Sequence, residues 1–225
     1  MEKRRKEILL CGGLFAVAII YTLLVKYIDV QEIGPNDSLV GFATINNFMF
    51  NLTGVNMLWY DITDWWGFVP LFIAFIYAMI GFIQMIKRRN ILKVDKEILG
   101  LGVYYIIVIG LYIFFETCII NYRPTLMDGI LEASYPSSHT LLSVCICGSS
   151  LIINKYLFKN RNFFKAENII SILSILVIVI GRFISGVHWF TDIVGAILIS
   201  IALLKAFNIY IKSQTVDKVK FVNSL

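Results

Sequence analysis

The chain has 225 residues, of which 58% are hydrophobic and 16% are charged, and its mean hydropathy is +0.78. A soluble domain carries about 25% charged residues, so this composition excludes a soluble globular protein and also the disordered, collagen-like and disulfide-scaffold classes. The net charge of +5 comes from basic clusters between apolar runs, which indicates membrane topology rather than nucleic-acid binding. The sequence therefore predicts an all-α integral membrane protein with one domain over residues 1–225.

Six apolar runs of roughly 20 residues each can cross a hydrocarbon layer of about 30 Å as helices. In chain order, we expect a bundle of six transmembrane helices at 8–28, 66–86, 98–120, 140–158, 166–185 and 189–211. The first run is longer than the apolar core of a signal peptide, and no small-residue cleavage site follows it, so we expect it to remain as a helix. Four cysteines in or beside these runs are interpreted as buried apolar side chains rather than disulfide partners or metal ligands: Cys11, Cys118, Cys145 and Cys147.

The first outer loop, residues 29–65, contains no apolar run of spanning length. Its aromatic residues alternate with polar ones, and aromatic residues favour the headgroup region of a membrane. We expect one or two short amphipathic helices lying on the outer surface. A partly ordered loop with interfacial aromatic anchors is the alternative.

The basic residues predict the orientation in the membrane. Seventeen of the 20 lie in the N-terminal segment, in the second and fourth connections or near the C-terminus, all on one side of the predicted helices. The positive-inside rule assigns this side to the cytoplasm, with both termini there, in a multi-pass protein of the cell membrane. Lys26, Arg123 and Arg182 remain for the extracytoplasmic side.

Both histidines of the chain, His139 and His188, lie at predicted outer ends of helices, at the same level as Arg123 and Arg182. Ionisable residues at the edge of a bilayer are costly unless they pair or take part in function. Two guanidinium groups suit the oxygens of a phosphate, although each arginine taken singly is equally well explained as a lipid-headgroup anchor. Together these residues indicate a candidate phosphate site on the extracytoplasmic face.

The remaining polar groups of this layer suggest a reaction. Asp192 follows His188 by four residues, which places both on one face if that stretch is helical. An aspartate that accepts one ring N–H leaves the other nitrogen free to attack, and His139 can serve as general acid and base. Ser137 and Ser138 precede a predicted helix, whose first N–H groups can hold an anion. The pattern predicts phosphoryl transfer with no metal and no other cofactor.

These segments resemble the signature of the type 2 phosphatidic acid phosphatase superfamily, membrane lipid phosphate phosphatases related to vanadium haloperoxidases. The signature is Lys, six residues and Arg-Pro; then Pro-Ser-Gly-His; then Ser-Arg, five residues, His, three residues and Asp. Arg123 and the proline after it fit the first motif, and residues 136–139 fit the second with serine for glycine. Arg182, His188 and Asp192 fit the third motif at matching spacings.

The resemblance implies a six-helix phosphatase and a role for each matching residue. It implies that His188 forms a phosphohistidine, that Asp192 orients His188, and that His139 protonates the leaving oxygen and later activates water. The residues that it implies for binding the phosphoryl oxygens are Arg123, Arg182, Ser137 and Ser138.

Two positions depart from the signature. Gly181 stands where the family has serine, and Glu116 stands where it has lysine, seven residues before Arg123. A carboxylate repels a phosphate. Glu116 either pairs with Arg123, or binds a cationic or hydroxylated part of a different substrate, or marks weakened catalysis.

The expected partner is a membrane lipid substrate, and no nucleic acid is expected. The candidates are a polyprenyl pyrophosphate, placed first by analogy with the family, phosphatidylglycerol phosphate and phosphatidic acid. A phosphoryl or headgroup transferase of the same fold is the alternative within enzymes, and a non-catalytic lipid-phosphate-binding protein is the alternative outside them. A transporter is less favoured, because these spans are polar mainly at the outer rim. The sequence does not predict an oligomeric state.

Overall fold

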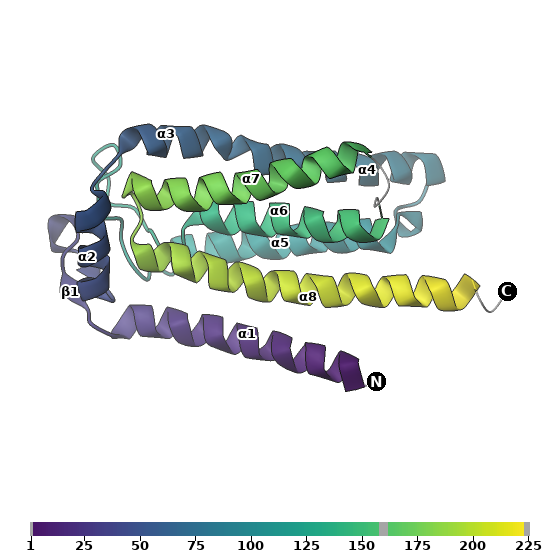
Figure 1. The fold of residues 1–225 in the computed structure, drawn as a ribbon, viewed down its shortest axis with the longest axis horizontal. Helices are drawn as coiled ribbons and strands as arrows, with labels where there is room; N and C mark the ends of the chain where they lie inside the picture. Colours follow the sequence, from purple (N-terminus) through teal and green to yellow (C-terminus); the bar gives the residue numbers. More distant parts are fainter. Residues whose placement is uncertain (1, 158–161, 223–225) are drawn as a thin grey trace.

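The computed structural model describes residues 2–157 and 162–222. Long helices lie side by side, with both chain termini at one end of the bundle and short elements at the other (Figure 1). The expected end of the fourth span, residue 158, and the basic residues Lys159 and Arg161 lie outside the described ranges.

Each predicted span corresponds to a helix in the described part of the chain. These helices are α1 (Glu2–Tyr27), α4 (Phe68–Arg88), α5 (Lys96–Thr117), α6 (Ser138–Leu157), α7 (Asn162–Ser185) and α8 (Phe190–Val222). The boundaries differ by a few residues, most at α1 and α8, because the helices continue past the apolar runs into polar sequence. A short 3-10 helix, η2 (Ile91–Lys93), lies between α4 and α5.

In the described residues, five segments are long and apolar enough to cross a membrane. These are α1, α5, α7, the segment Phe190–Gln214 of α8, and one segment formed by α3 and α4, Met57–Arg88. Helix α6 is not among them, so the predicted count of six is not confirmed. It packs against α4, α5, α7 and α8 and is buried along most of its length. Because neighbouring helices rather than lipid surround α6, its sequence accommodates several serines.

The first outer loop folds into a small cap at the end away from the termini. Strands β1 (Gln31–Glu32) and β2 (Leu39–Val40) pair antiparallel around the 3-10 helix η1 (Pro35–Asp37). Helix α2 (Ala43–Thr53) follows and runs across the end of the bundle (Figure 1).

Helix α3 (Met57–Trp66) differs from the expectation of a helix on the outer surface. It continues the line of α4 after Gly67 and packs against α7 (Figure 1). Gly67 keeps right-handed helical dihedral angles, so the chain passes from α3 into α4 without turning away. The predicted short helices are thus present, but α3 forms a wall of the bundle.

A buried asparagine fastens the cap to the start of α8. The Asn46 amide nitrogen donates to the Gly41 carbonyl at 2.8 Å and to the Thr191 hydroxyl at 2.9 Å, and its oxygen accepts the Thr191 N–H at 3.1 Å. These bonds satisfy a side chain that is 0% exposed. They hold the cap against the chain segment that carries the third motif.

Candidate active site

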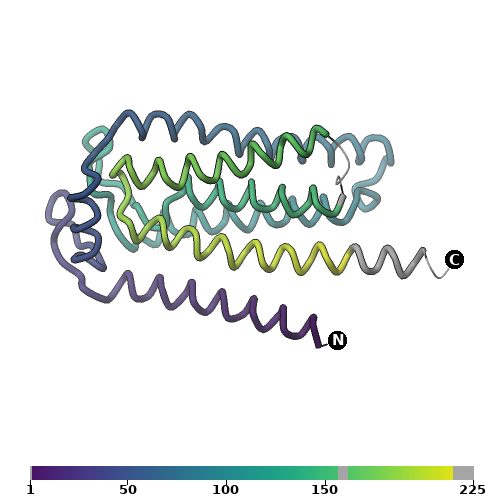
Figure 2. Tube along the Cα trace, in the orientation of Figure 1, coloured from purple at the N-terminus to yellow at the C-terminus, as the bar shows by residue number. Residues whose placement is uncertain are grey.

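The residues of the three motifs gather at the end of the bundle away from the termini. Arg123 lies in the connection between α5 and α6, which can be traced at that end in Figure 2. His139 lies in the first turn of α6, Arg182 in the last turn of α7, His188 just before α8 and Asp192 in its first turn. Residues far apart in the chain are therefore brought to one level of the bundle.

The imidazole of His188 is buried and is held by the main chain. Its Nδ1 lies 3.1 Å from the Ser134 carbonyl oxygen and 3.8 Å from Asp192 Oδ2. Because a carbonyl only accepts, Nδ1 carries the proton and Nε2 keeps its lone pair. The expected hydrogen bond to Asp192 is thus replaced by one to Ser134, since His188 precedes the helix and does not share a helical face with Asp192.

The electrostatic environment keeps His188 neutral. Burial lowers the pKa of His188 well below its ordinary value, and the positive charges of Arg123 and Arg182 and the nearby His139 lower it further. The same influences show that all four groups lie within electrostatic reach of one another. At neutral pH, Nε2 of His188 is unprotonated and lies within electrostatic reach of two guanidinium groups.

Asp192 holds the turn that carries His188. Its carboxylate accepts the Trp189 backbone N–H at 2.9 Å and the Asn121 side-chain amide at 3.5 Å. Its own carbonyl accepts the Ser137 N–H at 3.1 Å. Asp192 thus stabilises the turn between His188 and itself and joins the second motif to the third.

Arg182 is the largest fully buried side chain in the described part of the molecule. Its Nη2 lies 3.1 Å from Asp64 Oδ1, and its guanidinium carbon lies 4.9 Å from the centre of the Tyr60 ring. Both contacts come from α3. A cation at 0% exposure is costly unless paired, and these two groups partly compensate it.

Arg123 pairs with Glu132 instead of Glu116. Arg123 Nε lies 3.0 Å from Glu132 Oε2, and the Arg123 backbone N–H donates to the Glu132 carbonyl at 3.0 Å. Among the described residues, Glu116 forms no ion pair with Arg123; its side chain is exposed in the last turn of α5. The ion-pair partner of Arg123 therefore comes from the loop. For Glu116, two interpretations remain: it binds a cationic or hydroxylated part of a different substrate, or it marks weakened catalysis.

The two serines of the second motif are placed differently. Ser137 is fully buried, and its hydroxyl donates to the Thr140 hydroxyl at 3.1 Å, so it is used within the turn. Ser138 begins α6, whose first-turn N–H groups have no acceptor inside the helix. Of the pair, the N-terminus of α6 at Ser138 is the better placed to hold an anion.

Asp64 of α3 was not predicted as a site residue. One carboxylate oxygen, Oδ1, lies 3.2 Å from His139 Nε2 and 3.1 Å from Arg182 Nη2. The rule that ionisable residues at the membrane edge are functional candidates applies equally to Asp64, since it lies just before an apolar run at the outer rim. The sequence does not single out Asp64, because the composition of residues 29–65 predicts helices on the outer surface, away from the site.

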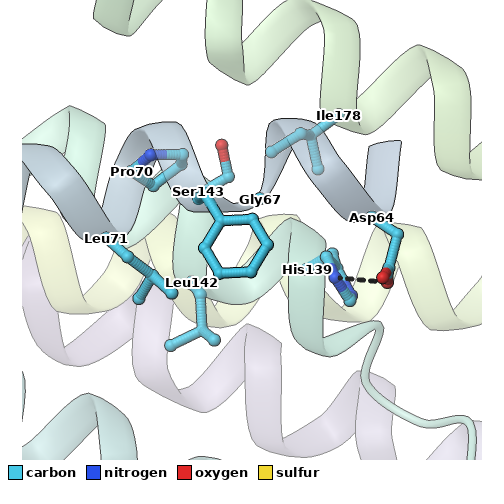
Figure 3. A pocket seen from close by; sticks show the side chains of 9 residues that line it. Asp64, Gly67, Pro70, Leu71, His139, Leu142, Ser143 and Ile178 are labelled. Carbon is cyan, nitrogen blue, oxygen red and sulfur yellow. Dashed lines mark ion pairs between the residues drawn. The ribbon is translucent and has the colours of Figure 1, made fainter. Parts of the chain in front are cut away.

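A mostly apolar pocket of about 170 Å³ adjoins His139. Figure 3 shows the ion pair of His139 and Asp64 at one end of this pocket, with Leu71 and Leu142 farther from it. The pocket lies between α4, α6 and α7, and its rim residues Phe68 and Leu71 are at least half exposed. The polar site therefore opens onto an apolar space that borders the lipid-facing surface.

The close packing of α3 explains the glycine that replaces the family's serine. A Cβ atom at Gly181 would lie 2.3 Å from Thr63 Cγ2 and 3.1 Å from Trp59 Cε3. Because real Cβ atoms do not approach other atoms so closely, a larger residue would displace α3 from α7. The departure at Gly181 belongs to the packing that brings Asp64 to the site.

Restoring the family's residue by Gly181→Ser is expected to harm this protein. Overpacking of this kind costs about 1–3 kcal/mol, so we expect a lower melting temperature in detergent, measured by tryptophan fluorescence, and lower activity. The double variant Gly181→Ser/Thr63→Ser removes the clashing Cγ2 but keeps the hydroxyl that donates to the Trp59 carbonyl at 2.7 Å. It should recover most of the loss; a single variant as stable as the wild type and more active would contradict this account.

The four basic side chains share one feature. Arg123 Nη1, Arg182 Nε and Nη1, His139 Nδ1 and His188 Nε2 are buried and have no hydrogen-bond partner among the described residues. Buried polar atoms without partners are uncommon, since each costs about 1–3 kcal/mol. Such unpartnered atoms on two guanidinium groups and two imidazoles, within electrostatic reach of one another, suit an oxyanion with several oxygens.

The family model of the PAP2 superfamily matches residues 114–215, which contain all three motifs. This chain carries a PAP2 superfamily region. The match confirms the resemblance seen in the motifs. Among solved structures, the chain is similar to a transmembrane PAP2-type phosphatidylglycerolphosphate phosphatase from Bacillus subtilis, with 18% identity and a TM-score of 0.53. That similarity covers 90% of this chain and 94% of the other. No curated protein matches the chain.

The shared architecture establishes the class of protein. The membrane PAP2 fold and the five apolar helices of the described chain identify a multi-pass membrane protein. Arg123, His139, Arg182, His188 and Asp192 all lie within the matched residues 114–215.

Proposed function

We propose that this protein hydrolyses a lipid phosphate or pyrophosphate at the outer leaflet through a phosphohistidine, without a metal ion. The observation that carries the proposal is His188: its Nε2 is buried, unprotonated and without a partner among the described residues, beside Arg123 and Arg182. A nucleophile held between two cations suits an electrophilic phosphorus with negatively charged oxygens. The PAP2 match supports the same reaction class.

The proposed mechanism has two steps. In the first, His188 Nε2 forms a bond to phosphorus while the bond between phosphorus and the lipid oxygen breaks, and a protonated His139 gives its proton to that oxygen. In the second, water attacks the phosphohistidine, His139 takes a proton from the water, and the N–P bond breaks to release phosphate. Arg123 and Arg182 stabilise the equatorial oxygens in both transition states.

The apolar pocket beside His139 supports a lipid as the substrate. Its lining by Phe68, Pro70, Leu71, Leu142 and Ile178 offers the start of an acyl or prenyl chain a route from the bilayer to the phosphate site. The candidates are a polyprenyl pyrophosphate, phosphatidylglycerol phosphate and phosphatidic acid. The Bacillus subtilis protein is a phosphatidylglycerolphosphate phosphatase by its description, and at 18% identity this selects none of the three for this chain.

The proposed orientation places both termini in the cytoplasm and the site on the extracytoplasmic face. It is supported by the basic residues, 17 of 20 of which lie on the side of the termini in the predicted topology. Cys118, which the sequence predicts to be buried, is instead exposed, because it lies just past the last turn of α5 at the end nearest the site. A membrane-impermeant maleimide should label Cys118 on intact cells, and labelling only after lysis would reverse the orientation.

Two alternatives keep specific support. A transferase would use the same phosphohistidine with a lipid or sugar hydroxyl in place of water, and product analysis with acceptor alcohols distinguishes it. A non-catalytic lipid-phosphate-binding protein is supported by Glu116, whose negative charge replaces the family's lysine. In that case the lipid binds but no phosphate is released.

The test is phosphate release by the full-length protein in detergent, from the three candidate lipids, with a chelator present. We expect release from at least one lipid at a rate that the chelator does not reduce. A panel with no release from any lipid would favour the non-catalytic alternative, and release abolished by the chelator and restored by a divalent cation would contradict the metal-independent mechanism.

A further inference from the structure

Asp64 joins the two halves of the candidate active site. Its single oxygen Oδ1 contacts His139 Nε2 from α6 and Arg182 Nη2 from α7. The Asp64 side chain is 48% exposed, whereas that of Arg182 is 0% exposed and that of His139 is 29% exposed. The carboxylate therefore approaches the site from its rim, through the open side.

The position of Asp64 is determined by the packing of α3. A Cβ at Gly67 would lie 3.1 Å from the His139 ring, and one at Gly186 would lie 1.8 Å from the Gly54 carbonyl oxygen. The Asn56 N–H also donates to the Ser185 carbonyl at 3.0 Å. These close approaches, together with the one at Gly181, hold both ends of α3 against the site. The packing therefore keeps Asp64 beside His139 and Arg182.

The charges around His139 make this carboxylate significant. Arg182 from α7 and Arg123 from the α5–α6 connection act on His139 as cations, Asp64 from α3 acts as an anion, and the neutral imidazole of His188 lies within reach. The proposed reaction needs a protonated His139 when the lipid oxygen leaves. Burial and the two nearby guanidinium groups lower the pKa of His139 to about 4, and the Asp64 carboxylate opposes this shift and so favours the protonated form.

The contact also selects the reacting nitrogen. Since a carboxylate accepts, Nε2 of His139 carries a proton directed at Asp64. Nδ1 of the same ring is buried and has no hydrogen-bond partner among the described residues. Nδ1 is thus the nitrogen available to exchange a proton with the substrate.

We propose that Asp64 is a positioning residue for catalysis, which stabilises the protonated form of His139 with Nδ1 directed at the leaving oxygen. This inference rests on the proposed phosphatase function. In the first step, the Nδ1 proton passes to the lipid oxygen while the N–P bond to His188 forms. In the second step, Nδ1 recovers a proton from water. Asp64 stays ionised and keeps its contact with the Nε2 proton throughout.

The test compares two substrates whose leaving groups depend to different degrees on protonation. Phosphatidic acid in mixed micelles loses a poor alkoxide leaving group and needs the proton, whereas p-nitrophenyl phosphate loses a stable phenolate and needs it little. For Asp64→Asn, we expect kcat/KM for phosphatidic acid to fall by about 10- to 100-fold, with the basic limb of its pH profile at lower pH. For p-nitrophenyl phosphate, we expect a fall of less than about threefold.

Two controls separate positioning from folding. Asp61→Asn changes an exposed aspartate one turn earlier on α3 and should leave both substrates unaffected. In a His139→Ala background, Asp64→Asn should add little further loss for phosphatidic acid, because Asp64 acts through His139. Equal losses for both substrates, or independent losses in the double variant, would show a general structural role and overturn the inference.

The failure of the inference can be distinguished from the failure of the proposed function. If the wild-type protein releases phosphate and Asp64→Asn matches it at every pH, Asp64 is not a positioning residue. If the wild-type protein releases phosphate from neither substrate nor from the other lipids, the phosphatase function itself is wrong and the inference falls with it.

Discussion

His188→Ala is expected to reduce phosphate release from the preferred lipid by a factor on the order of 10⁴ or more. The reason is that Nε2 of His188 is the nitrogen proposed to form the bond to phosphorus, and alanine leaves nothing to replace it. Arg123, Arg182 and His139 would still bind the phosphate, so KM should change far less than kcat. The measurement is phosphate release at saturating lipid.

A covalent intermediate gives the same prediction an independent measurement. With ³²P-labelled p-nitrophenyl phosphate, the wild-type protein should acquire label that is stable to alkali and lost in acid, as a phosphohistidine is. His139→Ala should still acquire label, because the p-nitrophenolate leaves without a proton, and should lose it slowly. Label on His188→Ala, or turnover of that variant equal to the wild type, would rule out His188 as the nucleophile.

Arg182→Ala is expected to lower kcat/KM by about 10²- to 10³-fold. Arg182 is 0% exposed, and its Nε and Nη1 are buried without partners among the described residues. Phosphoryl oxygens can accept hydrogen bonds from these two nitrogens. Donors held in a buried site stabilise developing negative charge more than donors in water do. Phosphatidic acid hydrolysis and inhibition by inorganic phosphate should both weaken.

Two control variants separate the effect of the charge of Arg182 from the effect of its location. Arg182→Lys keeps the charge but loses the planar fork of donors, so it should recover only a small part of the activity. Arg88→Ala removes an exposed arginine in the last turn of α4, paired with Asp95 at 2.9 Å, and should leave activity unchanged. An active Arg182→Ala protein, folded by its melting temperature, would remove the guanidinium from the mechanism.

The helices themselves illustrate what hydropathy can predict. The run 98–120 becomes α5, Lys96–Thr117, and the run 166–185 becomes α7, Asn162–Ser185. Their apolar faces remain exposed in the structure, for example at Ile106 and Ile169, as expected for surfaces that contact lipid. Helix α6 is less apolar, with several serines, because neighbouring helices rather than lipid cover it.

The outer loop illustrates where such patterns stop. The aromatic and polar composition of residues 29–65 indicates an interface but does not distinguish a helix on the surface from one packed along α7. That choice depends on small residues such as Gly181 and Gly67, whose partners are distant in the chain. The pairing of Arg123 with Glu132 rather than Glu116 has the same origin. The path of the connection between α5 and α6 determines which carboxylate lies beside Arg123.

The order of residues alone predicted that this is a predominantly helical membrane protein and that its motifs meet at one end of the bundle. Apolar length and the spacing of charged residues are properties of each segment, and alternate crossing of the membrane then assigns every helix end to a side. Only the tertiary structure decided that Asp64 reaches His139 and Arg182, and that His188 hydrogen-bonds to Ser134. These contacts depend on ångström-scale approaches between helices, which no single segment encodes.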